Sequence, residues 1–463
     1  MSGDSFKQCG RIVIVGAGLA GLRGAETLRA KGFTGSVTVV GEEEYEPYDR
    51  PPLSKQVLTG HAPANHTLLP RLGPLDGVDW RLGVKAVGLD RSANQVHLDD
   101  GSALSFDRVL IATGLRARPW PKKEEAALDG VFVVHGIDDA TAVRRRLEAG
   151  PGRVLVIGGG FIGSEFASVC RMLDIDVTLV ERGPSPLSGA LGGVIGDIAA
   201  GIQRADGVDL RTGTRVEALE GDEEGRVRAA RLSDGEMLQA DLVLAALGGI
   251  RNTEWLRGSG LAAGPLGVAC DAGCRAADEN AIVTDDVFVA GDVARFPHVL
   301  YGRELVALEH WRNAVVGAQI AAHNMLSEPV HRRPHVSVPM FWSIQFGVNI
   351  KSVGIPSIAD EIVITQGSPN DRRFVAAYGS QGRTVAAVTF DGAHWLEHYE
   401  SLIMSSAPFP PDLGDADQAT GADRKPAAFP PPGTVSHGPT VVVTGHSPTE
   451  VRAHRIFTEE MNP

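Results

Sequence analysis

The sequence predicts an α/β protein with two similar parallel-sheet units and a smaller α+β unit toward the C-terminal end. The main observation is an internal repeat: residues 11–43 and 153–181 share the order strand, glycine-rich turn, helix and strand. A strand, a helix and a strand within about 30 residues form the repeating unit of a parallel sheet. The length of 463 residues fits roughly three domains of about 150 residues each.

The first unit carries a glycine pattern directly after its first strand. Three glycines follow the strand in the spacing GxGxxG, namely Gly16, Gly18 and Gly21. The first glycine makes a tight turn, the second lets the backbone approach a pyrophosphate, and the third lets helix and strand pack closely. The helix N-terminus favours phosphate. Glu42, with Glu43 as a close alternative, ends the next strand and is the candidate partner of an adenosine ribose.

The second unit repeats the pattern with Gly158, Gly160 and Gly163. Its helix carries four apolar residues spaced by 4, 3 and 4, which predicts one buried face: Ile162, Phe166, Val169 and Leu173. Glu181 ends the second strand, where it can accept both hydroxyls of a ribose and would repel a 2′-phosphate. The unit therefore favours NADH over NADPH, although Arg182 beside it could accommodate that phosphate.

The remaining segments complete this organisation. Strands are predicted at residues 109–114, 242–247 and 287–292, a hinge at 119–121, and a helix at 310–325. Residues 330–404 form a separate strand-rich piece that finishes with a helix. Ten of the 28 prolines lie after residue 405, so no packed domain is expected there. Residues 441–443 are the apolar cluster of this tail and the candidate for a short strand that docks back.

Composition excludes several classes of function. The net charge of −13 argues against nucleic acid as a partner, because phosphate binding requires a basic face. Four cysteines cannot form a disulfide framework for a chain of this length, and no apolar run predicts a membrane span or a signal peptide. His394 and His398 lack the glutamate and third ligand of a metal motif. We therefore expect a cytoplasmic protein without a metal site.

Two dinucleotide sites in one chain indicate a flavin in one and a nicotinamide in the other. Several runs together resemble a known family: EEEYEPYDRPPLSK at 42–55, ATG at 112–114, GGGFIGSE at 158–165, AGD at 290–292, EHW at 309–311 and FWSIQF at 341–346. They are similar to those of the FAD-dependent NADH–ferredoxin reductases, the pyridine nucleotide-disulfide oxidoreductases that serve bacterial haem monooxygenases and aromatic-ring dioxygenases. The resemblance covers about residues 10 to 403.

The resemblance implies a glutathione-reductase-like fold with two Rossmann-like dinucleotide-binding domains. The implied parts are a discontinuous FAD domain (6–117 and 246–329), an NADH domain (118–245), a C-terminal α+β interface domain (330–405) and a proline-rich tail (406–463). The implied activity takes a hydride from NADH onto FAD and passes single electrons to an iron–sulfur ferredoxin. The chain would be a monomer or a homodimer.

The resemblance also implies roles for particular residues. Lys55 and Glu165 are the catalytic candidates, as electrostatic helpers beside the flavin and the nicotinamide carboxamide. Asp292 would accept from a ribityl hydroxyl, and Trp342 would lie close to the isoalloxazine ring. The helix after Glu309, His310 and Trp311 would point its N-terminus at the pyrimidine edge of the flavin. The other expected cofactor-binding residues are Gly16, Gly18, Ala20, Gly21, Glu42, Arg50, Ala86, Ala112, Thr113, Gly114, His135, Gly158, Gly160, Ile162, Gly163, Glu181 and Gly248.

The chain departs from the family pattern at four places. His135 stands where the family usually has an arginine that contacts FAD, and a neutral histidine gives up a permanent cation there. We therefore expect weaker retention of FAD. Ile344 replaces the aspartate of FWSDQ, and Arg251 replaces a proline. The tail beyond residue 405 has no counterpart.

Two other functions share these domains. One is a conformational or signalling flavoprotein of the apoptosis-inducing-factor type, whose DNA-binding members use basic surface that the acidic charge disfavours. The other is an NADH oxidase or a disulfide reductase, which would carry a redox cysteine where residues 44–60 have none. Cys270 and Cys274 are interpreted as structural thiols. The basic runs 144–146 and 332–333 are solvated faces or a docking patch for an acidic ferredoxin.

Overall fold

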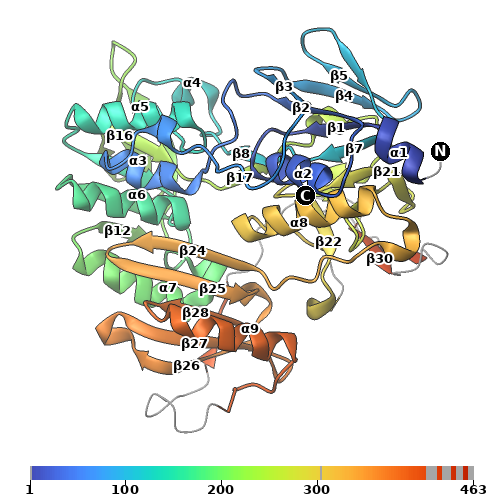
Figure 1. Ribbon diagram of the computed structural model, residues 1–463. Coiled ribbons are helices and arrows are strands. Elements are labelled where there is room, and N and C mark those ends of the chain that lie inside the picture. The colour runs from blue at the N-terminus through green and yellow to red at the C-terminus, as the bar shows by residue number, and fades with distance from the viewer. Residues whose placement is uncertain (1–2, 303–304, 413–424, 430–439, 445–451, 457–463) are drawn as a thin grey trace.

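The computed structural model describes residues 3–302, 305–412, 425–429, 440–444 and 452–456 (Figure 1). Blue and yellow segments, far apart in the sequence, share one unit in Figure 1. Green segments form a second unit, and orange to red segments form a third unit beside it. Within the described residues, no helix is both long enough and apolar enough to cross a bilayer.

The first unit is a six-stranded sheet in the order β20-β21-β7-β1-β2-β3. Its central strands are parallel, and β21 comes from far beyond the second unit in the sequence. Two helices of this unit, α2 and α8, pack against each other. The elements are β1 (Arg11–Val15), α2 (Leu19–Ala30), β2 (Ser36–Gly41), β3 (Val78–Leu82), β7 (Arg108–Ile111), β20 (Arg275–Ala277), β21 (Val283–Val289) and α8 (Trp311–Met325).

The second unit is a parallel five-stranded sheet in the order β12-β11-β10-β16-β9. All four residues of β10 and of β16 are buried, as expected for strands covered on both faces. The elements are β9 (Val131–Phe132), α5 (Ile137–Glu148), β10 (Val154–Ile157), α6 (Phe161–Met172), β11 (Val177–Glu181), α7 (Ser188–Ala205), β12 (Asp209–Thr212) and β16 (Leu242–Ala245).

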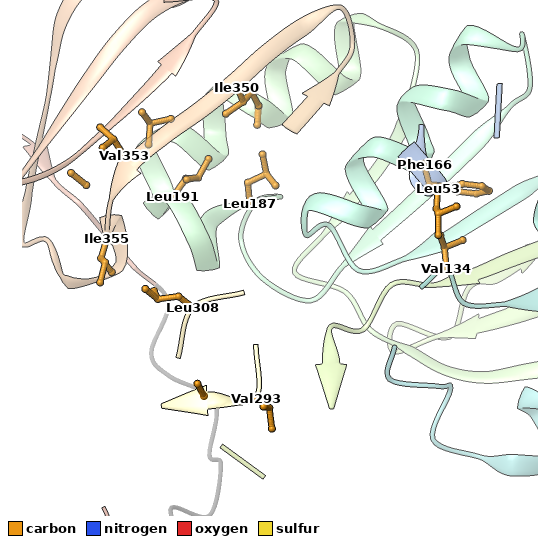
Figure 2. Close-up of a cluster of buried hydrophobic side chains, with 14 of the residues drawn as sticks. Leu53, Val134, Phe166, Leu187, Leu191, Val293, Leu308, Ile350, Val353 and Ile355 are labelled. Carbon is orange, nitrogen blue, oxygen red and sulfur yellow. The ribbon is translucent and has the colours of Figure 1, made fainter. Parts of the chain in front are cut away.

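The C-terminal unit is an antiparallel sheet in the order β24-β25-β28-β27-β26-β29, with α9 packed on it. Its predicted strands and final helix are confirmed. The elements are β24 (Met340–Gln345), β25 (Val348–Gly354), β26 (Glu361–Ser368), β27 (Arg373–Ser380), β28 (Arg383–Phe390), α9 (Leu396–Met404) and β29 (Lys425–Pro426). Figure 2 shows Leu187 and Leu191, at the start of α7, in one apolar cluster with Ile350 and Val353 of β25.

Smaller elements connect and cover these units. An antiparallel pair, β8 with β17, carries the two chain segments that pass between the first and second units. The strands are β4 (Ala86–Asp90), β5 (Gln95–Leu98), β6 (Ala103–Ser105), β8 (Leu115–Ala117), β13 (Val216–Gly221), β14 (Val227–Leu232), β15 (Met237–Gln239), β17 (Gly249–Arg251), β18 (Ala263–Gly264), β19 (Gly267–Ala269), β22 (Ala294–Pro297) and β23 (Leu305–Val306). The short helices are α1 (Gly3–Cys9), α3 (Gln56–Thr59) and α4 (Lys123–Ala126), and a 3₁₀ turn, η1, covers Pro51–Ser54.

Two expectations need correction or extension. Phe166 and Val169 of α6 are buried as predicted, but Ile162 is 40% exposed because it lies in the first turn of the helix, beside the glycine turn. In the tail, residues 425–429 pack against the C-terminal sheet, which the proline content did not predict. The apolar cluster 441–443 lies in β30 (Thr440–Thr444), which pairs with β31 (Arg452–Ile456).

Candidate active site

The first glycine turn, called the first cradle below, consists of Gly16, Gly18 and Gly21. Gly16 has a φ of 118°, and a β-carbon there would overlap the backbone oxygen of Ala112. A β-carbon at Gly21 would overlap the backbone oxygen of Gly16. A β-carbon at Gly18, in contrast, would meet no atom within 4 Å. The turn is thus closed against the protein at two glycines and open at the middle one, as pyrophosphate binding requires.

The second cradle, formed by Gly158, Gly160 and Gly163, has the same three environments. Gly158 has a φ of 105° and packs against the backbone oxygen of Ala246. A β-carbon at Gly163 would overlap the oxygen of Gly158, whereas one at Gly160 would meet nothing within 4 Å. Both cradles therefore fit a dinucleotide by the same criterion.

The two chain segments that lead to and from the second unit are joined beside the first cradle by reciprocal hydrogen bonds. Thr113 Oγ1 donates to the backbone oxygen of Asn252 at 2.8 Å, and Asn252 Nδ2 donates to the backbone oxygen of Thr113 at 2.8 Å. Gly114 and Gly248 lie on this connection with φ of 59° and 81°, and both have open space at the β-carbon position. These bonds fix the ends of the two crossing segments.

The structure separates the two acids proposed for the first ribose. Glu42 is exposed at the end of β2, and its Oε1 accepts from Lys85 Nζ at 2.6 Å. Glu43 instead turns toward Arg50, which donates to its Oε1 at 2.5 Å, and toward the hydroxyl of Tyr48. Burial opposes ionisation of Glu43, but Arg50 and the hydrogen bond from Tyr48 hold its pKa below the usual value. Glu42 is therefore the more accessible of the two acids, with 63% of its side chain exposed against 40% for Glu43.

Arg50 and His135 come together at the junction of the first and second units. Arg50 Nη1 donates to the backbone oxygen of His135 at 2.9 Å. Burial, assisted by the charge of Arg50, lowers the pKa of the His135 imidazole to about 4. His135 is therefore neutral near pH 7, as the sequence predicted, but Arg50 supplies a permanent cation at the same place.

Lys55 and Glu165 form an ion pair between the first and second units. Lys55 Nζ lies 2.7 Å from Glu165 Oε2, which also accepts from Ser54 Oγ at 2.6 Å. The other oxygen, Oε1, accepts from Ser343 Oγ at 2.6 Å. Ser343 Oγ in turn accepts from Gln345 Nε2 at 3.0 Å. The Glu165 side chain is only 3% exposed. Residues of all three units therefore meet at one buried carboxylate.

Ser343 and Gln345 were missed by the sequence analysis. The signal was present in the FWSIQF run, because alternate residues of a strand face opposite sides. Ser343 and Gln345 are buried, whereas Trp342 and Ile344 are exposed on the other face. The run therefore presents a polar inner face to Glu165 and an apolar outer face to solvent.

The start of α8 brings the predicted aromatic residues together. Trp311 Nε1 donates to Asp49 Oδ1 at 2.9 Å, and the Trp311 ring meets Trp342 edge-on with centroids 6.3 Å apart. Burial raises the pKa of Asp49. His310 packs on Phe341 at 5.3 Å, and burial lowers the pKa of its imidazole to about 4. Its Nδ1 is buried without a protein partner and is free to bond to a polar ligand atom.

Asp292 lies after β21 in a turn whose middle residue, Gly291, has a φ of 77°. Arg251 donates from Nε to the backbone oxygen of Asp292 at 2.9 Å and from Nη2 to Glu309 Oε1 at 2.9 Å. Burial and the nearby Glu309 raise the pKa of Asp292 to about 7, although Arg251 and Arg50 oppose the shift. Arg251, in place of a proline, thus ties the AGD turn to the residues that precede α8.

Glu181 bridges two backbone groups beside the second cradle. Its Oε2 accepts from the Gly159 N–H at 2.6 Å, and its Oε1 accepts from the Gly183 N–H at 2.5 Å. Arg182, the next residue, is exposed. The carboxylate is therefore fixed next to the glycine turn.

The remaining expected residues belong to the surroundings of the cradles. Ala20 is buried next to Gly291, and Ala86 is a buried residue at the start of β4. Among the described residues, no group of three or more histidine, cysteine or acidic side chains could hold a metal ion. Cys170, Cys270 and Cys274 are buried, and burial raises the pKa of each thiol, that of Cys170 to about 12.

Comparison with known families gives the class of the chain. Residues 10–318 match the family described as pyridine nucleotide-disulphide oxidoreductase, and residues 340–421 match a reductase C-terminal family. The chain therefore belongs to the pyridine nucleotide-disulphide oxidoreductase family. Enzymes of this family use a flavin together with NAD(H) or a related nucleotide, which agrees with two cradles in one chain.

Within that family, the similar proteins include ferredoxin reductases, and the resemblance inferred from the motifs is confirmed. A putidaredoxin reductase from Pseudomonas putida is 34% identical over 409 residues, 87% of this chain and 93% of that protein. The ferredoxin–NAD(+) reductase component of the biphenyl dioxygenase system of Paraburkholderia xenovorans (strain LB400) is 35% identical over 354 residues, 76% and 83% of the two chains. The structure of a covalent putidaredoxin reductase–putidaredoxin complex matches with a TM-score of 0.80 and 32% identity, covering 87% of this chain and 94% of that one.

Proposed function

We propose that this chain is an NADH-dependent ferredoxin reductase that binds FAD in the first cradle and NADH in the second. It passes electrons one at a time to an iron–sulfur ferredoxin that serves an oxygenase, either a haem monooxygenase or a ring dioxygenase. When bound, FAD supplies the chemistry, because it can accept a hydride and release electrons singly. The observation that carries the proposal is the Lys55–Glu165 pair, which joins the two nucleotide-binding units.

The two cradles would hold the pyrophosphates. At Gly18 and Gly160 the backbone is open, and the N-termini of α2 and α6 offer unpaired N–H groups to phosphate. Glu42 and Glu181 would bind the two adenosine riboses. Asp292 and the start of α8 close the first cradle from the remote part of the chain.

Lys55 and Glu165 would set the electrostatics between the two nucleotides. Glu165 holds Lys55 Nζ in place and is itself fixed by Ser54 and Ser343. A cation held there favours negative charge on the isoalloxazine ring. Arg50 would act on the FAD diphosphate side in place of the missing arginine at position 135. No side chain needs to act as a nucleophile.

The C-terminal unit would provide the surface for the ferredoxin. Trp342 is 38% exposed and contacts Trp311 at the start of α8, so this face lies close to the proposed flavin site. We assign the FAD domain to 6–117 and 246–329, the NADH domain to 118–245, the interface domain to 330–405 and the tail to 406–463. The chain would work in the cytoplasm.

The test is turnover by the FAD-loaded chain with and without a small iron–sulfur ferredoxin. We expect a yellow protein that oxidises NADH much faster when the ferredoxin is present. Rapid NADH-dependent oxygen consumption without ferredoxin would instead indicate an oxidase. Slow turnover with any one-electron acceptor would indicate a conformational or signalling flavoprotein.

A further inference from the structure

Residues 425–429, called the strap below, lie outside both matched family regions, which end at 318 and 421. The strap adds a short strand to the free edge of β26, where Lys425 pairs with Ile362. The N–H of Ala427 donates to the backbone oxygen of Asp360 at 3.0 Å. Ala427 is 1% exposed, so the strap is seated on the C-terminal unit by its middle residue.

The other side of the strap contacts α7 of the second unit. This helix is interrupted at Gly192, which has a φ of 79° and a ψ of 163°. The N–H of Gly193 donates to the backbone oxygens of Ala427 and Ala428 at 3.1 and 3.0 Å. A β-carbon at Gly192 would overlap the Ala427 oxygen. The interruption of α7 therefore exposes a backbone N–H to the strap, and the missing side chain at Gly192 leaves room for the Ala427 oxygen.

The first turn of α7 leads from the strap to the second cradle. The N–H of Leu187 donates to the backbone oxygen of Gly159 at 2.8 Å, and Gly159 in turn donates to Glu181. At the other end of the turn, the Tyr378 hydroxyl of β27 donates to the backbone oxygen of Leu191 at 2.6 Å. Figure 2 shows Leu187 and Leu191 in the apolar cluster next to β25. The turn is thus bonded to the cradle at one end and to the C-terminal unit at the other.

We propose that the strap positions the second cradle for its nucleotide. By holding Gly193 it fixes the first turn of α7, and through Leu187 it fixes the Gly159–Glu181 contact. A loop ordered before the ligand arrives does not have to be ordered on binding, so the strap should raise nucleotide affinity. Among the described residues, no hydrogen bond joins the strap to the middle glycines or to Glu181, so it acts through α7 rather than on the nucleotide. The inference rests on the proposed function, because it assumes that the second cradle binds NADH.

The test compares two aspartate substitutions in the full-length chain. Ala427→Asp places a carboxylate at a buried position and should displace the strap. Ala428→Asp adds the same charge at the next, exposed residue, whose φ of 50° aspartate tolerates. We expect Ala427→Asp to weaken NAD⁺ binding, measured by calorimetry, by about tenfold and to speed amide hydrogen exchange in residues 187–193. Flavin retention should stay unchanged, and Ala428→Asp should resemble the unmodified chain.

A second strap variant covers the case in which Ala427→Asp does not fold. Phe429→Ala removes a ring that lies 3.4 Å from the β-carbon position of Gly192 without burying a charge. It should weaken NAD⁺ binding in the same direction by a smaller factor. If the strap variants show faster amide hydrogen exchange at 187–193 but an unchanged NAD⁺ affinity, this inference is wrong and the proposed function still stands. An unmodified chain that binds no pyridine nucleotide would overturn the proposed function, and this inference with it.

Discussion

The two cradles have the same backbone design but different surroundings. In both, the outer glycines are packed against backbone oxygens and the middle glycine is open. The acid beside the first cradle, Glu42, is exposed and pairs with Lys85, whereas Glu181 is bonded to the backbone of its own glycine turn. Ala112 and Gly291, from later segments of the first unit, lie against the first cradle and its helix, while the C-terminal unit and the strap contact α7 beside the second. The glycines thus define where a dinucleotide can lie, and the surroundings distinguish the two sites.

The largest expected effect comes from closing one cradle at a time. Gly18→Ala should abolish retention of FAD, and Gly160→Ala should weaken NADH binding by about a hundredfold, since charged hydrogen bonds to a pyrophosphate would be lost. Both positions are open, so the chain should still fold. Flavin content after gel filtration and NAD⁺ calorimetry measure the two effects separately. Loss of both cofactors in either variant would show that the cradles are not independent.

The buried Lys55–Glu165 pair and the exposed Lys85–Glu42 pair should differ in their effect on stability. Glu165→Gln leaves Lys55 unpaired in a buried place and should lower the free energy of unfolding by about 3 kcal/mol. The matched change at the exposed pair, Glu42→Gln, should cost less than about 0.5 kcal/mol. Urea denaturation measures both values. Lys55→Met and the double variant complete the cycle, and a double variant whose loss of stability equals the sum of the two single losses would show that the pair is not coupled.

Specificity for the nucleotide should depend on the second acid and not on the first. Glu181→Ala removes the carboxylate that would repel a 2′-phosphate, so the preference for NADH over NADPH should shrink by roughly tenfold. Glu42→Ala should leave that preference unchanged. The ratio of kcat/KM for the two nucleotides is the measurement, and an unchanged ratio in Glu181→Ala would remove Glu181 from the site.

The smallest expected effect is the contribution of His135 to the pH dependence of FAD binding. The pKa of His135 is lowered to about 4, so its imidazole stays neutral from about pH 5.5 to 8. Any contribution of a protonated His135 would begin only as the pH falls toward 4. Asp292, whose pKa is raised to about 7, also lies at the proposed flavin site, so the test compares the pH profile of FAD release in the unmodified chain with that in His135→Gln. Followed by flavin fluorescence after dilution, the two profiles should coincide over that range. A transition near the usual histidine pKa that is present in the unmodified chain and absent from His135→Gln would contradict the low value.

The sequence predicted the parts of the structure that depend on local patterns. Both glycine turns, the strands around them and the start of α8 follow from short motifs whose physical requirements are met within about 30 residues. Lys55 and Glu165 were named from motifs, but their direct contact spans 110 residues and was not predicted. Ser343 reaches Glu165 across 178 residues, and the alternation in the FWSIQF run indicates a polar inner face but not its partner.

Three other findings show why composition and local patterns were insufficient. A proline-rich tail predicts no packed domain, but five residues suffice to add an edge strand to an existing sheet. Arg251 was recognised as a departure from a proline, yet its bonds to Asp292 and Glu309 depend on how the first unit closes. Ile162 fits a helical repeat but lies at the exposed first turn. In each case the contact or the exposure of the residue depends on tertiary packing, which a local sequence pattern does not specify.

The most direct test of the account is an anaerobic titration of the FAD-loaded chain with NADH, followed by the visible absorbance of the flavin. We predict that the chain retains FAD and that each NADH added bleaches one bound flavin until all of it is reduced. A chain that stays colourless after reconstitution with FAD, or a bound flavin that NADH leaves unchanged, would contradict the claim that the two cradles serve one hydride transfer.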